Sequence, residues 1–294
     1  MFITKYRKWF IGFSALLAIL GVATVAVSGL DYGIEFTGGS VLEVSYDEKP
    51  QIEDVRSALN EIGFGETLLQ PFGENGYVVK TKPITEGERK ELVAAMRVEG
   101  SVMTIERFNS IGPSVGKELR TKSLYALIAV SIGIVLFVAY AFRHVSRPVS
   151  SWKYGIVAVI ALLHDIVIPI GILTLLGTEI NTLYVVGLLS ILGLSVNDTI
   201  VVFDRIRENL AHNEEKNLAE DFTKTVGNAI SQTITRSIFT SLTLFVVLLA
   251  LYFFGPVATQ TLSLVLLLGT LVGTYSSIFL ASPLLTLLVG KKAK

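Results

Sequence analysis

Three polar residues in succession, Asn197-Asp198-Thr199, interrupt a segment that is otherwise apolar enough to lie in lipid, SILGLSVNDTIVVF. A carboxylate inside a bilayer is costly and is rarely kept without a partner or a task. If the helix meets cytoplasmic water near Asp204, Asp198 lies about 9 Å deeper at the helical rise. The chemistry that such a carboxylate suits is the gain and loss of a proton.

Small and polar residues recur on the same predicted helix. Ser190, Gly193 and Asn197 are spaced i, i+3 and i+7, so they share one face. Such a face favours the close approach of a neighbouring helix. We therefore expect the triplet at 197–199 to face the interior of a helix bundle.

The candidate partner of Asp198 is Arg236. The segment before it, NAISQTIT, carries no charge, and if the helix enters the membrane near Ile230, Arg236 is also about 9 Å deep. In two antiparallel helices, Asp198 and Arg236 at matched depth can pair. Three interpretations stay open: a functional pair, a structural buried ion pair, and an arginine that marks the interface and extends its charge to water.

A further polar site is His164-Asp165, about 15 Å from the start of its predicted helix at Tyr154 and thus near mid-membrane. Adjacent residues on a helix diverge by about 100°, so the two side chains are not expected to point at one partner. One can orient a neighbouring helix while the other lines a polar path. A structural hydrogen-bonding role and a proton-relay role both stay open.

Together these residues predict proton movement. Protonation of Asp198 would release Arg236, and their two helices would then reorient. One charge that crosses the membrane field yields about 2.3 kcal/mol per 100 mV, enough to bias two states separated by a few kcal/mol. The candidate proton pathway consists of Asp198, Arg236, Asn197, Thr199, His164 and Asp165.

Charged residues on several apolar helices are expected in a multi-span membrane protein, and the composition indicates such a protein. The chain has 294 residues, 51% of them hydrophobic, and a mean hydropathy of +0.60. Its 25 basic and 25 acidic residues balance, so no positive excess points to nucleic acid. There is no cysteine, and the three histidines (His144, His164 and His212) are widely separated. We therefore predict no metal and no cofactor.

Six stretches reach the roughly 20 apolar residues that a spanning helix needs; they are approximately 9–30, 122–142, 154–177, 182–203, 234–254 and 260–290. The first follows Lys5, Arg7 and Lys8 and so resembles a secretory signal. Its apolar run nevertheless exceeds the usual signal-peptide core of about 7–15 residues. We expect an uncleaved membrane anchor.

Lysine and arginine near span ends set the orientation, because basic loops stay cytoplasmic. Basic residues gather at four places along the chain: Lys5, Arg7 and Lys8; Arg143, Arg147 and Lys153; Arg205, Arg207, Lys216 and Lys224; Lys291, Lys292 and Lys294. The short loops near Glu179 and Pro256 have none. Both termini are thus predicted to be cytoplasmic, and the long segment 31–121 is predicted to be external.

The external segment reads as one α+β domain. Strand composition marks 41–46, ETLLQPF and GYVVKT suggest a hairpin, and SVMTIERF gives a last strand. Helical spacing marks 52–62, and the capping-box pattern Thr85-x-x-Glu88 opens a second helix through Met96. The order β-α-β-β-α-β predicts a ferredoxin-like sandwich. Since it has no histidine or cysteine, a binding or moving part is favoured over an enzyme.

Several motifs resemble the SecD/SecF family of protein-export membrane subunits. DYGIEFTGGS (31–40) resembles the family's Gly-Gly signature, and SVNDTIVVFDRIREN (195–209) resembles the SecF version of the fourth span. IGPSVGKEL (111–119), LLHDIVIPIGI (162–172) and ISQTITRSIFTSL (230–242) match in order and spacing. The resemblance covers almost the whole chain. It divides the chain into a first span (1–30), the external domain (31–121) and a five-helix part (122–294) with a cytoplasmic loop at about 204–233.

The resemblance implies a SecF-type subunit, without enzymatic activity, that resides in the cytoplasmic (inner) membrane and has a fold related to resistance-nodulation-division transporters. It implies that SecD, the SecYEG channel, a YajC-type accessory subunit, membrane lipid and the translocating preprotein are partners. It also implies that Asp198 and Arg236 respond to the proton-motive force while the external domain draws preprotein outward.

Alternatives remain at two levels. The subunit can be a non-coupling scaffold that stabilises SecD and the channel, or, more remotely, a self-contained exporter of small molecules. The signature residues Gly33, Phe36, Thr37, Gly38 and Gly39 can form a flexible joint that transmits span movement, or a fixed turn that glycine permits.

Overall fold

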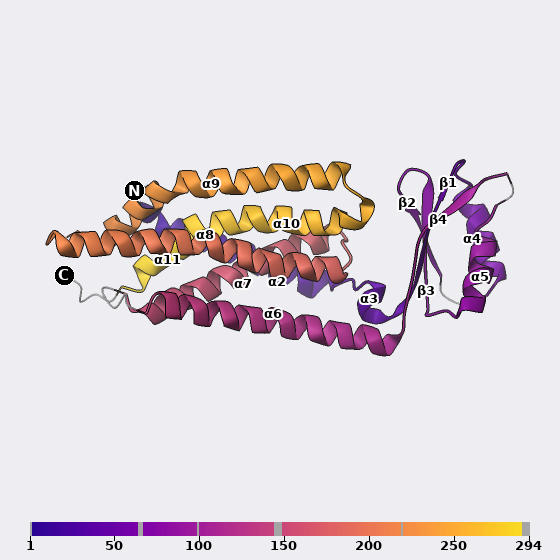
Figure 1. Cartoon of the computed structure of the whole chain (residues 1–294), viewed down its shortest axis with the longest axis horizontal. Coiled ribbons are helices and arrows are strands. Elements are labelled where there is room, and N and C mark those ends of the chain that lie inside the picture. Colours follow the sequence, from indigo (N-terminus) through magenta and orange to yellow (C-terminus); the bar gives the residue numbers. More distant parts are fainter. Residues whose placement is uncertain (1, 64–66, 99, 144–148, 219, 290–294) are drawn as a thin grey trace. The chain divides into compact units, whose positions relative to one another are not determined.

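The computed structural model describes residues 2–63, 67–98, 100–143, 149–218 and 220–289. It separates into two compact units, one made of Met1–Asp31 with Tyr125–Lys294, the other of Tyr32–Leu124. Each unit has its own hydrophobic core. Figure 1 shows that the first is built of helices and the second carries the sheet.

In the described part of the chain, six helices are long and apolar enough to cross a membrane, as predicted. They are α2 (Arg7–Ser28), α6 (Pro113–Ala141), α7 (Ser151–Leu175), α8 (Thr182–Glu215), α9 (Phe222–Phe254) and the continuous stretch of α10 (Val257–Ser276), the π-helix η1 (Ser277–Ala281) and α11 (Ser282–Leu287). A short α1 (Phe2–Lys5) precedes them. Both α8 and α9 extend well beyond the predicted apolar spans, so most of 204–233 is helical.

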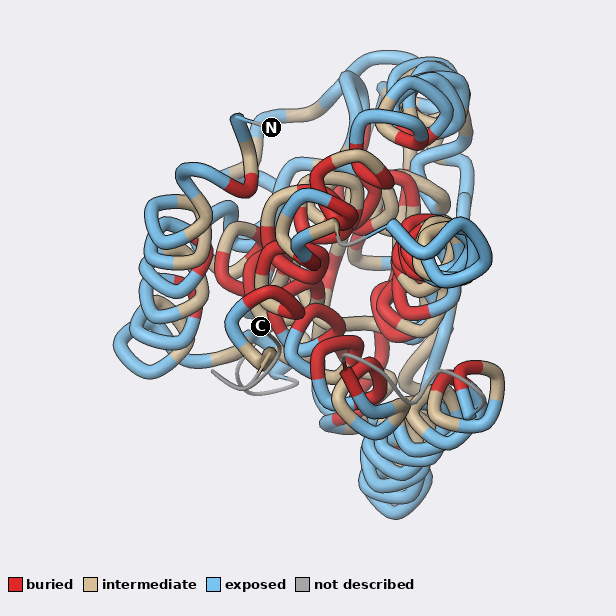
Figure 2. The backbone as a smooth tube through the Cα atoms, turned by 90° about the vertical axis from the view of Figure 1, so that its left-hand side faces the viewer, coloured by how far each residue is buried: buried red, intermediate tan, exposed pale blue. Residues whose placement is uncertain are grey.

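The helical unit has an inner and an outer layer. More than half of the apolar window of α7 and of the last span is buried, and half of that of α8, whereas α2, α6 and α9 are mostly exposed. In Figure 2 the buried stretches gather on the central helices. Exposed apolar helices are expected where the neighbouring solvent is lipid.

Glycines set the closest contacts between these helices. A Cβ on Gly171 of α7 would lie 2.5 Å from Gly21 Cα of α2. One on Gly269 of α10 would lie 2.1 Å from Ile191 Cγ1 of α8, and one on Gly273 would lie 3.1 Å from Ser195 Cβ. Small residues let helix backbones approach one another in membranes.

Two basic residues, Arg7 and Lys153, link the starts of α2, α7 and α9 to α11. Arg7 Nη1 donates to Thr223 Oγ1 at 3.4 Å and to Thr286 Oγ1 at 3.0 Å, which joins the starts of α2 and α9 to α11. Lys153 Nζ donates to the Leu288 carbonyl at 2.6 Å and adds the start of α7. The orientation residues Arg147, Lys291, Lys292 and Lys294 lie outside the described residues.

The second unit has the predicted element order. β1 (Gly39–Tyr46), α4 (Ile52–Glu61), β2 (Leu68–Phe72), β3 (Gly76–Thr81), α5 (Glu86–Ala95) and β4 (Met103–Ile111) form an antiparallel sheet of order β2-β3-β1-β4. Leu42 and Val44 of β1, Val55 of α4 and Leu92 of α5 are fully buried together. The predicted capping box is present: Thr85 accepts from the Glu88 amide, and the Glu88 side chain accepts from the Thr85 amide.

Candidate functional site

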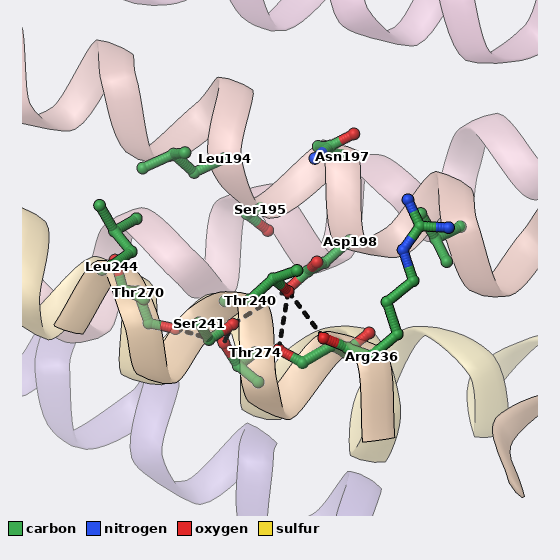
Figure 3. Close-up of a pocket in the computed structure, with 14 residues that line it drawn as sticks. Leu194, Ser195, Asn197, Asp198, Arg236, Thr240, Ser241, Leu244, Thr270 and Thr274 are labelled. Atoms are coloured by element: carbon green, nitrogen blue, oxygen red, sulfur yellow. Dashed lines mark hydrogen bonds between the residues drawn. The ribbon is translucent and has the colours of Figure 1, made fainter. Parts of the chain in front are cut away.

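A polar cavity lies among α8, α9 and α10. Its volume is about 110 Å³. It is lined by Leu194, Ser195, Asn197, Asp198, Val201, Arg236, Ser237, Thr240, Ser241, Leu244, Gly269, Thr270, Gly273 and Thr274. The cavity therefore brings together the two charged residues that the sequence singled out, with hydroxyl groups from their own helices and from α10 (Figure 3).

Asp198 is held by a chain of hydroxyls. Ser241 Oγ of α9 donates to Asp198 Oδ2 at 3.4 Å, and Thr274 Oγ1 of α10 donates to Ser241 Oγ at 2.5 Å. Asp198 is half-buried in this arrangement. The carboxylate thus connects three helices through groups that both donate and accept hydrogen bonds.

Arg236 lines the same cavity but does not pair directly with Asp198. Within the described residues, no ion pair with an N···O distance up to 4.0 Å joins them, and Figure 3 shows the guanidinium extended toward α8. The predicted direct pair is therefore replaced by two charges that face one cavity. Reorganisation of a few side chains, or water between them, suffices to couple such charges.

The expectation that all three residues of the triplet face inward is wrong for Asn197. Thr199 is buried at 2% exposure, whereas Asn197 is exposed and lies at the cavity rim. Consecutive helical residues point about 100° apart, so three in succession cannot share one environment. Gly193, on the same face as Asn197, has no atom of the described chain within 4 Å of an added Cβ. The predicted close approach occurs instead at Ile191 and Ser195, next to α10.

His164 and Asp165 form a second polar site inside the bundle. Asp165 is fully buried, and its Oδ2 accepts hydrogen bonds from Ser195 Oγ of α8 and from Ser276 Oγ of α10, the latter at 2.7 Å. Its Oδ1 lies 2.9 Å from Nδ1 of His164. The two side chains contact each other, which the 100° divergence did not predict. His164 Nε2 is buried and has no partner among the described residues.

Sequence reasoning missed the hydroxyl partners. Ser195 and Ser241 lie within the motifs 195–209 and 230–242 but are not singled out there, and Thr274 and Ser276 lie in none of the motifs that resemble the family. The available signal was the spacing in GTLVGTYSS (269–277), where glycines recur at i and i+4 and threonines follow each of them. That pattern indicates a close-packed face beside a polar one.

The signature segment packs tightly within its own unit. α3 (Ile34–Thr37) begins after Gly33 and ends at Gly38, whose φ is +79°; Gly39 follows at +147°. A Cβ on Gly38 would lie 2.7 Å from Pro113 Cα, at the start of α6. Phe36 is buried, and Thr37 Oγ1 donates to the Gly33 carbonyl at 3.1 Å. Gly38 and Gly39 therefore adopt backbone angles that favour glycine, and a side chain at either position would collide with neighbouring atoms.

Family models match two regions of the chain. The model described as "Protein export membrane protein SecD/SecF, C-terminal" matches residues 92–291, and the model of the SecD/SecF GG motif matches residues 24–49. The first covers more than half of the chain, including the cavity and the His164-Asp165 site. The second covers the glycine segment.

Individual relatives point to the same family as the family models. The protein translocase subunit SecF of Thermobaculum terrenum is 40% identical over 96% of this chain and 92% of its own, and that of Escherichia coli O157:H7 is 36% identical over 95% and 85%. The crystal structure of SecDF from Thermus thermophilus, a translocon-associated membrane protein, superposes with a TM-score of 0.83 at 31% identity over 95% of this chain. This chain spans only 37% of that SecDF chain.

Proposed function

This chain belongs to the SecD/SecF family of protein-export membrane proteins, as a multi-pass translocase subunit of the SecF type, and we propose that it couples the proton-motive force to protein export. In this proposal Asp198 takes up and releases a proton, and Arg236 responds to its charge. The observation that carries the proposal is the convergence of both residues on one polar cavity between α8, α9 and α10.

The geometry supports a relative movement of helices rather than bond chemistry. Asp198 and Arg236 come from two different helices, and a third helix contributes the hydroxyl that orders Ser241. A change of charge on Asp198 alters its attraction to Arg236 and its demand for hydrogen-bond donors. Since the site connects three spans, protonation can shift their packing.

The proposal extends to place and partners. Both termini lie in the cytoplasm, the membrane is the cytoplasmic (inner) membrane, and the ferredoxin-like domain lies outside, where it meets the emerging preprotein. A SecD subunit supplies the remaining spans, in keeping with the fraction of the SecDF chain that this one covers. The SecYEG channel and a YajC-type subunit complete the assembly.

The test compares two aspartates on one helix. Asp198→Asn removes the carboxylate of the cavity, whereas Asp204→Asn makes the same change at an exposed residue six positions further along α8, where Asp204 pairs with Arg207. Vesicles that contain this chain, its SecD partner and the channel are assayed for release of a preprotein with and without a proton gradient.

We expect Asp198→Asn to reduce gradient-dependent stimulation to the level of vesicles without a gradient, at normal assembly, and Asp204→Asn to retain it. Unchanged stimulation in Asp198→Asn would overturn the coupling proposal. The subunit would then be the non-coupling scaffold, with proton chemistry left to SecD. Loss of assembly in both variants would also contradict the proposal, because it would make the effect structural.

A further inference from the structure

Two buried hydroxyls that face the Asp198 cavity have no partner in the part of the chain that the structure describes. Ser237 Oγ and Thr270 Oγ1 both line it, are 1% and 7% exposed, and have no hydrogen-bond partner among the described residues. A buried polar group without a partner is expensive, so such groups usually bind water. One water needs roughly 10–15 Å³ of such a cavity, and this one offers about 110 Å³. The geometry therefore favours a small cluster of waters beside Asp198.

Ser195 belongs to both polar sites. It lines the cavity, and it lies one helical turn before Asp198 on α8. Its hydroxyl also donates to Asp165 Oδ2 of α7. A hydroxyl can accept one proton while it donates another, so Ser195 is suited to pass a proton between the cavity and Asp165.

Three side chains of the described residues form hydrogen bonds with the Asp165 carboxyl. The groups that face it are Ser195 from α8, Ser276 from α10 and its neighbour His164 on α7. Tyr275 of α10 stacks against His164, with ring centroids 6.2 Å apart, and accepts from Ser14 of α2 at 3.2 Å. The titratable groups at this site in the described chain are therefore His164 and Tyr275, and neither lines the Asp198 cavity.

We propose that Asp165 is a second proton-accepting carboxylate of this chain, reached from the Asp198 cavity through the hydroxyl of Ser195. The inference rests on the proton coupling proposed above and names part of its route. In the step, a hydronium ion in the cavity gives a proton to Ser195 Oγ while Ser195 gives its own proton to Asp165 Oδ2. The products are water, an unchanged hydroxyl and a carboxylic acid, so atoms and charge balance.

The structure provides a matched control. Ser276 donates to the same carboxylate oxygen of Asp165 but does not line the Asp198 cavity. Ser195→Ala and Ser276→Ala therefore delete the same atom and remove one hydrogen bond from the same acceptor. Only the first interrupts the proposed route.

The experiment follows the Asp165 carboxyl itself by infrared spectroscopy, in the full chain assembled with its SecD partner in membranes. An Asp198→Asn background removes the competing carboxyl signal, and the band that disappears on adding Asp165→Asn is assigned to Asp165. After transfer to heavy water, the deuterium shift of the protonated band is timed in the two serine variants. The pH is varied between about 4 and 10, the range that covers shifted carboxyls.

We expect an Asp165 band that titrates, and hydrogen–deuterium exchange that Ser195→Ala slows by about 100-fold, the smallest factor that a positioned proton-transfer group ordinarily supplies. Ser276→Ala should leave the exchange rate unchanged. Where Ser195→Ala fails to assemble, Ser195→Cys keeps the volume with only a weak donor and should slow exchange similarly.

An Asp165 band that never titrates, or equal slowing in both serine variants, would overturn the inference. The readout does not involve export, so the two proposals fail separately. Export that ignores Asp198→Asn removes the coupling proposal even where exchange depends on Ser195. Exchange that ignores Ser195 removes only the route.

Discussion

The glycine signature offers a prediction that separates backbone strain from steric contact. Gly38 has φ of +79°, and an added Cβ would lie 2.7 Å from Pro113 Cα and 2.9 Å from Pro113 N. Gly63 has a similar φ of +67° but nothing within 4 Å, and Gly112 has neither constraint. Alanine at position 38 therefore adds both strain and a steric clash, and alanine at position 63 adds strain alone. Alanine at position 112 adds neither.

The magnitudes follow from the two causes. An L-residue in the left-handed region costs about 1–2 kcal/mol, and overpacking against atoms that cannot turn away costs about 1–3 kcal/mol. Gly38→Ala should thus destabilise the unit Tyr32–Leu124 by about 2–5 kcal/mol, Gly63→Ala by about 1–2 kcal/mol, and Gly112→Ala by less than about 0.5 kcal/mol. A domain of this size is stable by about 5–14 kcal/mol, so Gly63→Ala and Gly112→Ala should remain folded, and Gly38→Ala should do so wherever its cost is below that stability.

Native-state hydrogen exchange in the full chain measures these differences. The amides of the fully buried Leu42 and Val44 in β1 report the opening of the whole sheet-containing unit. Since each 1.4 kcal/mol is a factor of about ten, their exchange should accelerate about 30-fold to 4,000-fold in Gly38→Ala. Gly63→Ala should accelerate it about 5-fold to 30-fold.

Equal exchange in Gly38→Ala and Gly63→Ala would refute the reasoning. It would mean that the contact between Gly38 and Pro113 contributes nothing in the working protein. A segment free of that contact is a flexible joint, not a fixed turn. The same pair of variants, assayed for export, then shows whether joint movement matters to function.

Two further predictions concern packing and titration. Burial raises the pKa of Tyr46 from 10.0 to about 12, and its hydroxyl donates to the Met96 carbonyl. Because the folded pKa exceeds the unfolded one, the stabilisation from the protonated Tyr46 hydroxyl is complete below pH 10 and declines as the pH rises toward 12. Tyr46→Phe should therefore flatten the decline of the unfolding free energy between pH 10 and 12. Gly269→Ala would place Cβ 2.1 Å from the buried Ile191 side chain, so the thermal midpoint of the solubilised chain should fall by the equivalent of about 1–3 kcal/mol. Gly193→Ala, whose added Cβ would have nothing within 4 Å, should leave the midpoint unchanged. Equal midpoints in the two variants would contradict the contact between Gly269 and Ile191.

The sequence predicts the fold well where one physical signal dominates. Apolar length alone defines the six spans, because a bilayer leaves few alternatives to a helix. The sheet-containing domain follows from alternating and helical periods in the sequence, and the capping box of Thr85 and Glu88 marks a helix start within one residue. The helix ends outside the apolar spans are less predictable. α8 continues through polar residues to Glu215, and no change in hydropathy marks Glu215 as its last residue.

The site is predictable only in part. Charge in an apolar segment reveals Asp198, Arg236 and Asp165, because each is costly there. Their partners are serines and threonines, which satisfy backbone carbonyls within their own helix as readily as they contact another helix. Which of them reach a carboxylate depends on how α8, α9 and α10 are rotated against one another, and that rotation is a property of packing.

The rotation is nevertheless encoded in α10. Gly269 and Gly273 lie on one face and admit the backbone of α8, as their contacts with Ile191 and Ser195 show. Thr270 and Thr274 follow each glycine by one residue, about 100° around the helix, and face the Asp198 cavity. A hydroxyl on a short side chain reaches a carboxylate on another helix only where the backbones are close. The glycines therefore bring the hydroxyls of α10 within reach of both sites: Ser276 of Asp165, and Thr274 of the Asp198 network.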